Sequence, residues 1–220
     1  FLLIAQQIEN SIGQVNQLKY EGKKQFLSVA SNDSTNLFTL VPFYKQFMKR
    51  HPDIALAIHT YHTTEIYNKL AQNQFDIGIV TFQKKQYDVQ TKLIYKEPTF
   101  LITPRFSKYY NGIDAKDLPA EKEVCIRWNE YFNAWHDEIW GKNNYYARVS
   151  NGTDLANYMD EEGMWAIVTL SVALQLMETH PLSIYSLKEE PPKIHYYLAK
   201  KERKALQNWM RCQEIDFQIT

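Results

Sequence analysis

Two clusters of short polar side chains directly follow apolar runs of the sequence, and both have the composition of an anion-binding helix start. The first cluster, NDST at 32–35, follows the run 26–31, and the second, HTTE at 62–65, follows the run 53–60. Hydroxyl and amide side chains are preferred helix N-caps. A helix N-terminus also presents free N–H groups and a positive dipole end, which favour a carboxylate or phosphate. The serine and threonines of these clusters either cap a helix only, or cap it and also contact a ligand.

Four tryptophans and one arginine are further candidates for ligand contact. Trp128 and Trp165 fall at expected strand ends or loops, so each either lines a cleft or packs in the core. Trp135 and Trp140 fall within an expected helix, and we predict that both pack in the core. Arg127 either pairs a ligand carboxylate or forms an ion pair at the surface, which is the commoner arrangement.

The sequence lacks the common catalytic, dinucleotide and phosphate-loop motifs. No GxGxxG follows the first apolar run, and GxxxxGK[ST], GxSxG and HExxH do not occur. Cys125 and Cys212 lie far apart without a CxxC or a zinc-type histidine spacing, so no metal site is predicted. The acidic pair Glu161-Glu162 is typical of a solvated face. We therefore expect no enzyme activity, no cofactor and two reduced thiols.

Charge and hydropathy narrow the possible partners. The chain has 220 residues with 25 basic and 25 acidic side chains, so its formal net charge is zero. Such a chain has no electrostatic surplus for nucleic acid over its whole length. No apolar run approaches the roughly 18 residues that span a bilayer, and the opening FLLIAQQ lacks the features of a secretory signal. We expect a cytoplasmic chain without a membrane partner, whose sequence begins inside a longer protein.

The polar clusters sit within an alternation of strand and helix patterns. Strands are predicted at 26–31, 53–60 and 75–80, with a helix ending at Arg50 and another beginning near 63. Pro42 means that the first of these helices either starts late, near Val41, or is kinked there. Such alternation implies parallel strands with right-handed crossovers. Ligands then collect beyond the carboxyl ends of the strands, where the loops 31–35, 61–65 and 81–83 emerge.

The second half of the chain repeats this alternation without a visible sequence repeat. Strands at 93–95 and 99–103 lead out of the first unit, with the crossing expected near Pro104, and the strand 194–199 returns to it. Between them we predict strands 123–128, 147–150 and 164–168, each followed by a helix. A final helix contains Ala205, Leu206, Trp209 and Met210. The expected organisation is a first lobe of residues 21–104 and 193–220 and a second lobe of residues 105–192.

The opening segment 1–20 reads as a separate amphipathic helix. Ile4, Ile8, Ile12 and Val15 form one apolar stripe on an otherwise polar pattern, and Gly22 supplies a stop. The stripe packs either on its own domain or on another chain, as the end of a linker would.

The first lobe resembles the effector-binding domain of LysR-type transcriptional regulators. The resemblance rests on FLSVAS at 26–31, Leu40-Val41-Pro42 in the following helix, RHPDIAL at 50–56, and the pattern from Thr64 to Ile79. In that pattern Gln74-Phe75 replaces the Gly-x-Leu common in the family. In the second lobe Trp165 and Thr169 stand where the family commonly has glycine and proline. The resemblance is therefore carried by about 55 residues of the first lobe.

The resemblance implies an α/β fold of two Rossmann-like lobes joined by two crossover strands, as in periplasmic binding proteins of type II. It further implies a small, anionic effector between the lobes, a homodimer or homotetramer, and DNA binding only through an N-terminal winged helix-turn-helix outside this sequence. The segment 1–20 would be the end of the linker helix, and the helix 37–50 would contact the partner's second lobe. A stand-alone solute-binding protein of the same bilobal fold is the alternative. The predicted effector-binding residues are Asn32, Ser34, Thr35, His62, Thr63, Thr64, Thr81, Phe82, Trp128, Asn129, Asn151 and Trp165.

Overall fold

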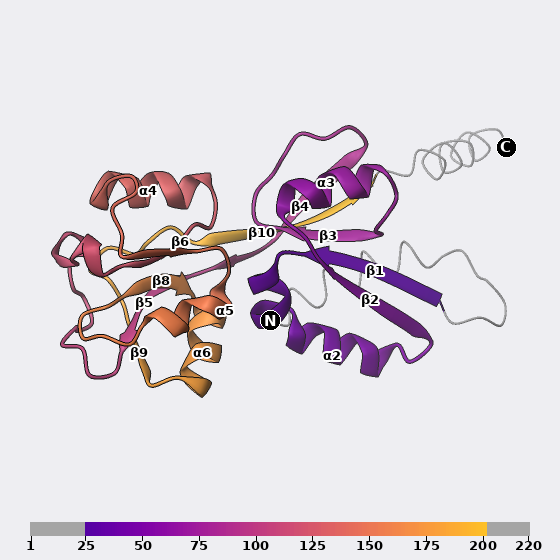
Figure 1. The fold of residues 1–220 in the computed structure, drawn as a ribbon. Coiled ribbons are helices and arrows are strands. Elements are labelled where there is room, and N and C mark those ends of the chain that lie inside the picture. Colours follow the sequence, from indigo (N-terminus) through magenta and orange to yellow (C-terminus); the bar gives the residue numbers. More distant parts are fainter. Residues whose placement is uncertain (1–24, 202–220) are drawn as a thin grey trace, which may run out of the picture.

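The computed structural model describes residues 25–201, and Figure 1 shows two α/β lobes side by side, joined by extended chain. This arrangement confirms the expected fold class of two lobes joined by crossover strands. The predicted linker helix at 1–20 and the predicted final helix around 205–210 lie outside the described residues.

The first lobe is built on a five-stranded sheet with the order β2-β1-β3-β10-β4. β1 pairs in parallel with β2 and β3, whereas β10 runs antiparallel to β3 and β4. A half-buried side chain fixes this register, because Asp76 Oδ2 accepts hydrogen bonds from the Ser28 backbone N–H at 2.8 Å and from its hydroxyl at 2.7 Å. The strands are β1 (Gln25–Ser31), β2 (Ile54–Thr60), β3 (Ile77–Val80), β4 (Val89–Glu97) and β10 (Ile194–Lys201).

Three helical segments cover both faces of this sheet: the π-helix η1 (Thr35–Thr39), α2 (Val41–Arg50) and α3 (Thr63–Ala71). The predicted helix near 37–50 is therefore two segments. Leu40 is both the C-cap residue of η1 and the N-cap residue of α2. Pro42 stands in the first turn of α2, where a missing N–H costs nothing because that donor has no helical partner. Of the two possibilities left open by the sequence, the late start at Val41 is the one observed.

The second lobe contains a three-stranded antiparallel sheet and a two-stranded parallel one. β5 pairs with β8 and β9, and β6 pairs with β7. A single bridge between Glu123 and Trp165 connects the two sheets. The strands are β5 (Thr99–Pro104), β6 (Val124–Ile126), β7 (Ala147–Val149), β8 (Ala166–Thr169) and β9 (Leu182–Tyr185), of which β9 is not anticipated from the sequence.

The helices of the second lobe lie on both faces of its strands, with α4 on one side and α5 and α6 on the other (Figure 1). Their bounds are α4 (Glu130–Trp140), α5 (Gly152–Leu155) and α6 (Leu170–Thr179). Short 3-10 turns complete the lobe: η2 (Ala115–Asp117), η3 (Ala120–Lys122) and η4 (Ala156–Tyr158). Side-chain oxygens of Asn129 and Asn151 accept backbone N–H groups at the starts of α4 and α5.

The chain crosses between the two sheets at Pro98, because β4 ends at Glu97 in the first lobe and β5 begins at Thr99 in the second. This crossing comes earlier than the one expected near Pro104. The return crossing lies beside it, since Glu97 pairs with Ile194 at the start of β10.

A buried carboxylate holds the two crossings together. Glu97 is only 2% exposed. Its Oε1 accepts the backbone N–H of Ser171 at the start of α6 at 2.7 Å, and its Oε2 accepts the hydroxyl of Tyr196 on β10 at 2.8 Å. Burial raises the pKa of the Glu97 carboxyl, and the hydrogen bonds from Ser171 and Tyr196 offset part of this rise. One side chain thus links β4, β10 and the second lobe.

Replacing Glu97 should destabilise the whole domain. Glu97→Gln leaves one acceptor oxygen and turns an amide N–H toward the second donor, so we expect the free energy of unfolding to fall by about 2 kcal/mol in urea titrations. Tyr196→Phe removes only one of the donors and serves as the matched variant, with a smaller loss. An unchanged urea midpoint for Glu97→Gln would contradict this role.

The raised pKa of Glu97 also predicts a pH dependence. Because the folded state binds this proton more tightly than the unfolded state, the contribution of Glu97 to stability is largest below the unfolded pKa of about 4.3. It declines as pH rises through the higher folded-state pKa. The stability advantage of the natural chain over Glu97→Gln should therefore be greater near about pH 4 than near about pH 7. If the stability advantage of the natural chain instead grows with pH, the pKa of Glu97 is lowered rather than raised on folding.

Candidate functional site

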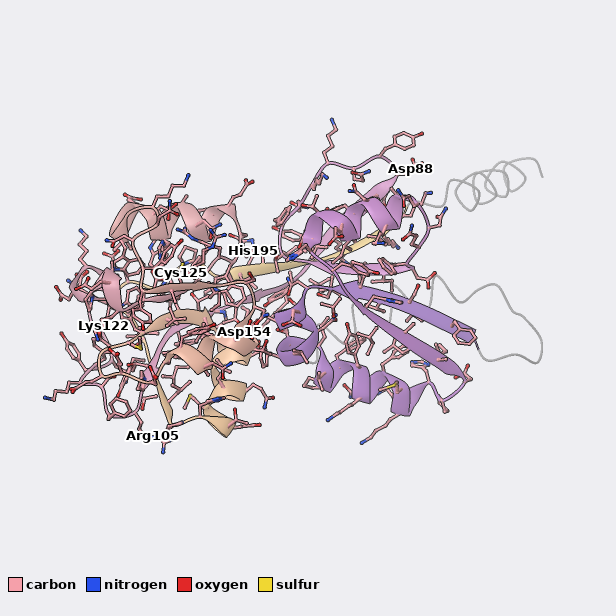
Figure 2. The ribbon with its side chains drawn as sticks, in the orientation of Figure 1. Asp88, Arg105, Lys122, Cys125, Asp154 and His195 are labelled. Carbon is pink, nitrogen blue, oxygen red and sulfur yellow. The ribbon has the colours of Figure 1, made fainter. Side chains whose placement is uncertain are left out.

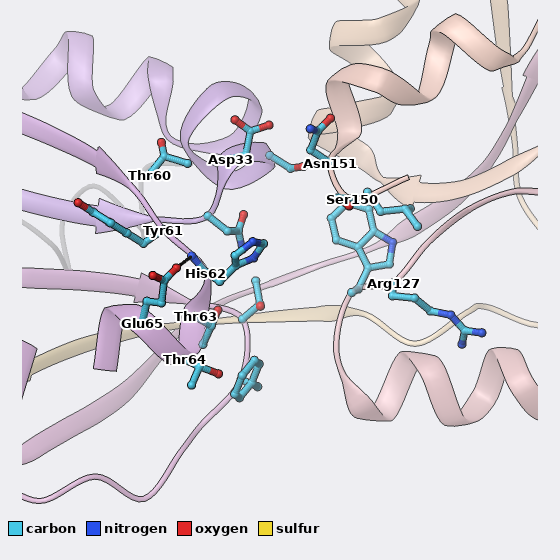
Figure 3. A pocket seen from close by; sticks show the side chains of 16 residues that line it. Asp33, Thr60, Tyr61, His62, Thr63, Thr64, Glu65, Arg127, Ser150 and Asn151 are labelled. Atoms are coloured by element: carbon cyan, nitrogen blue, oxygen red, sulfur yellow. Dashed lines mark hydrogen bonds between the residues drawn. The ribbon is translucent and has the colours of Figure 1, made fainter. Parts of the chain in front are cut away.

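A cavity of about 570 Å³ lies between the two lobes. Figure 3 shows residues of the first lobe on one side of it and Arg127, Ser150 and Asn151 of the second lobe on the other. Its lining consists of Asn32, Asp33, Ser34, Thr60, Tyr61, His62, Thr63, Thr64, Glu65, Thr81, Phe82, Ile126, Arg127, Trp128, Ser150 and Asn151. All of these residues stand at or just after the carboxyl end of β1, β2, β3, β6 or β7, the edge where ligands collect in open α/β sheets.

The start of α3 faces this cavity. His62 is the N-cap in an extended conformation, and its backbone N–H donates to the Glu65 carboxylate at 3.4 Å. Figure 3 shows this contact beside Thr63 and Thr64, the first two residues of the helix. The backbone N–H groups of the first helical turn have no partner within the helix, and they lie at the positive end of its dipole. This end of the cavity therefore favours a negatively charged or strongly accepting group.

The second lobe contributes a wall with one aromatic ring and little free positive charge. Trp128 is half-buried, and its Nε1–H donates to the backbone carbonyl of Ile167 at 3.2 Å, which fixes the ring on β8. The Arg127 guanidinium forms an ion pair with Asp137 on α4 and points away from the cavity (Figure 3). Of the two roles considered for Arg127, the structure shows the ion pair.

The two lobes touch directly at the edge of the cavity. The Gly152 backbone N–H donates to Ser34 Oγ at 2.9 Å, and the hydroxyls of Thr39 and Ser171 lie 2.9 Å apart. A methyl group on Gly152 would lie 3.1 Å from the Phe38 ring and 3.2 Å from Ser34 Oγ. Glycine at this position thus permits the close approach of the lobes.

The structure brings most of the predicted effector-binding residues together. Those that line the cavity are Asn32, Ser34, His62, Thr63, Thr64, Thr81, Phe82, Trp128 and Asn151. Asn32 also caps the first helical turn, since its Oδ1 accepts the Thr35 N–H at 2.9 Å. Asn32 therefore both caps this helical turn and lines the cavity.

Three predicted residues lie outside the cavity lining. Thr35 is buried, one residue beyond the lining segment 32–34. Asn129 uses its side chain to cap α4 through the Phe132 N–H at 2.9 Å. Trp165 is fully buried, with its Nε1–H bonded to the carbonyl of Pro119 at 2.8 Å and its ring 4.9 Å from that of Trp140. Of the two possibilities for Trp165, core packing is the one observed.

Arg127 also lines the cavity and was considered for ligand contact from the sequence. Sequence reasoning missed the other lining residues, namely Asp33, Thr60, Tyr61, Glu65, Ile126 and Ser150. A usable signal existed for Ile126 and Ser150, because they lie at the carboxyl ends of β6 and β7 just as the polar clusters lie beyond β1 and β2. The carboxyl ends of strands are where ligands collect in open α/β sheets, and the same expectation in the second lobe would have included both residues.

Residues 21–212 match the family described as the LysR substrate binding domain, and the chain belongs to that family. The family and its structural neighbours are regulatory effector-binding domains, with the two-lobed fold of type II periplasmic binding proteins. Comparison with curated proteins gave no match. Among the residues that the structure describes, no helix is long and apolar enough to cross a membrane.

Several solved structures share this fold. The effector binding domain of QuiR in complex with shikimate is 15% identical, with a TM-score of 0.68 over 82% of this chain and 89% of that one. The regulatory domain of MexT, a transcriptional activator in Pseudomonas aeruginosa, is 14% identical, with a TM-score of 0.68 over 85% and 96%. The reduced regulatory domain of OxyR2 from Vibrio vulnificus is 13% identical, with a TM-score of 0.70 over 88% and 95%.

Removing the hydroxyl of Ser34 should loosen the contact between the lobes. Ser34→Ala leaves the buried Gly152 N–H without its acceptor, so we expect faster amide hydrogen exchange at Gly152 and about 1 kcal/mol lower stability. Thr153→Ala is the matched control, because its exposed hydroxyl bonds only to Asn151 in its own lobe. Equal exchange rates at Gly152 in both variants would show that the Ser34 hydrogen bond does not hold the lobes together.

Proposed function

We propose that this chain is the ligand-sensing domain of a cytoplasmic LysR-type transcriptional regulator, and that it binds a small metabolite carrying a carboxylate. The observation that supports this function best is the inter-lobe cavity onto which the first turn of α3 opens. Membership of the LysR substrate binding domain family favours a regulator over a stand-alone solute-binding protein.

The polarity of the cavity supports an anionic ligand with additional hydroxyl or amino groups. The free N–H groups of Thr63 and Thr64 suit a carboxylate, and the nearby hydroxyls of both threonines can donate further hydrogen bonds. Asp33 and Glu65 add acceptors to the same lobe, so a ligand that also carries hydrogen-bond donors fits better than a plain carboxylate. The shikimate bound by QuiR is a ligand of this chemical class.

Regulation would follow from the way the lobes meet. A ligand that contacts both the α3 start and the wall of Trp128 and Asn151 binds most tightly when the lobes are close, so it favours the closed arrangement. In the full protein this shift would alter the packing between subunits of a homodimer or homotetramer, and so the spacing of DNA-binding segments. We propose α2 as the first-lobe element at that subunit contact.

The α3 contribution can be tested with two variants at one position. Thr63 is the first residue of α3 and follows an extended His62, a position that proline tolerates. Thr63→Pro removes the backbone N–H, whereas Thr63→Ala keeps it and removes only the hydroxyl. A thermal-shift screen of hydroxy- and aminocarboxylates would supply the ligand, and calorimetry the affinities.

We expect Thr63→Pro to weaken binding of the carboxylate by roughly tenfold or more, and Thr63→Ala to weaken it less. Circular dichroism would confirm that both variants remain folded. If Thr63→Pro binds the ligand as tightly as the natural chain, the helix start is not the carboxylate site. If no carboxylate shifts the melting temperature, the proposed ligand class is wrong.

A further inference from the structure

The second lobe contains another cluster of chemically reactive side chains, buried behind the cavity wall. Glu123, Cys125 and His136 are 2%, 0% and 0% exposed. One potential ligand atom from each lies within 4.8 Å of the others. Within residues 25–201, these three side chains are thus close enough together to share one metal ion. Figure 2 places Cys125 inside the second lobe.

The local fold explains why three residues without a sequence motif converge. Glu123 and Cys125 are two positions apart at the start of β6, so their side chains leave the same face of the strand. His136 lies on α4 one turn after Phe132, on the buried face of the helix. α4 therefore lays an imidazole directly over the carboxylate and the thiol.

The distances are close to those of a coordination sphere. His136 Nε2 lies 2.9 and 2.8 Å from the two carboxylate oxygens of Glu123, and 3.9 Å from Cys125 Sγ. Around a tetrahedral Zn²⁺ the corresponding separations are about 3.3 Å between oxygen and nitrogen and about 3.6 Å between sulfur and nitrogen. Binding would require the separation of His136 from Glu123 to widen by about 0.5 Å and that of His136 from Cys125 to shorten by about 0.3 Å.

A second carboxylate orients the imidazole from its other side. His136 Nδ1 lies 3.2 Å from Asp137 Oδ1, which is also paired with the Arg127 guanidinium. A histidine that ligates a metal through one nitrogen commonly donates the other N–H to a carboxylate, which fixes its tautomer. Asp137 stands in that position here.

The charges of the cluster also suit a divalent cation. Both ring nitrogens of His136 face carboxylate oxygens, with Glu123 at Nε2 and Asp137 at Nδ1. A dication bound by the Glu123 carboxylate and the Cys125 thiolate would be neutralised by its own ligands, which avoids the main cost of placing an ion in a protein core.

We propose that Glu123, Cys125 and His136 form a binding site for a divalent transition metal, for which Zn²⁺ is the best-matched ion. A mixed set of thiolate, imidazole and carboxylate ligands is typical of zinc, and three protein ligands leave the fourth position to a water molecule or a backbone carbonyl. The site is separate from the effector cavity, and the pair formed by Arg127 and Asp137 lies between them.

Cobalt substitution provides a direct test. The whole chain, purified and freed of metal, is titrated with Co²⁺, and we expect a thiolate-to-cobalt charge-transfer band that saturates at about one equivalent. The Cys212→Ser variant, which keeps Cys125 as its sole cysteine, should retain this band. Cys125→Ser should lose it. Absence of the band in the folded Cys212→Ser variant would overturn the proposal.

Zinc calorimetry provides an independent test that needs no ligand variant. Titration of the natural chain with Zn²⁺ in buffers of different ionisation enthalpy should show release of protons on metal binding, and affinity should rise with pH because the ligands must be deprotonated. Asp137→Asn should weaken Zn²⁺ binding by about tenfold or more, because it removes the carboxylate behind His136. Binding of fewer than about 0.1 equivalents of Zn²⁺ would show that the cluster is only a hydrogen-bonded network.

Discussion

The buried carboxylate of Glu97 is the interaction on which the relation between the two lobes depends. It lies where the chain leaves the first lobe, and it binds both Tyr196 on the returning strand and the first turn of α6 in the second lobe. A charge buried to this extent is tolerated only when its oxygens are hydrogen-bonded. These donors therefore tie the two crossings into one junction, from which the lobes project with their strand ends facing each other.

Because the junction leaves the strand ends of the two lobes facing each other, a cavity lies between them. The two walls of this cavity differ in chemistry. The first lobe supplies a helix start and several hydroxyls, whereas the second supplies the Trp128 ring and the Asn151 amide, and its arginine is already paired with Asp137. A ligand is thus oriented by polar groups of the first lobe and covered by the second. Ser34 and Gly152 form a hydrogen bond between the lobes at the rim of the cavity. A change in the spacing of the lobes would therefore alter a contact directly beside the ligand site.

The sequence predicted the first lobe well because its signals are local. Strand alternation, capping clusters and Pro42 each depend on neighbouring residues, and they located β1 to β3, the start of α3 and seven of the first-lobe residues that line the cavity. Trp165 lies outside the cavity lining because it packs in the core, where its Nε1–H bonds to the carbonyl of Pro119, a distant partner that no local pattern shows. Asn129 also lies outside the lining, because its side chain caps the first turn of its own helix, α4. The convergence of Cys125 with His136 was likewise invisible, since it arises only when α4 packs on β6.

The central claim is that a carboxylate-bearing metabolite binds between the lobes at the start of α3. The most direct measurement is a crystal structure of this chain with the carboxylate that raises its melting temperature most. The account predicts a carboxylate oxygen within hydrogen-bond distance of the Thr63 and Thr64 backbone N–H groups, with the rest of the ligand against Trp128. A ligand bound outside the inter-lobe cavity, or with its carboxylate turned away from α3, would contradict it.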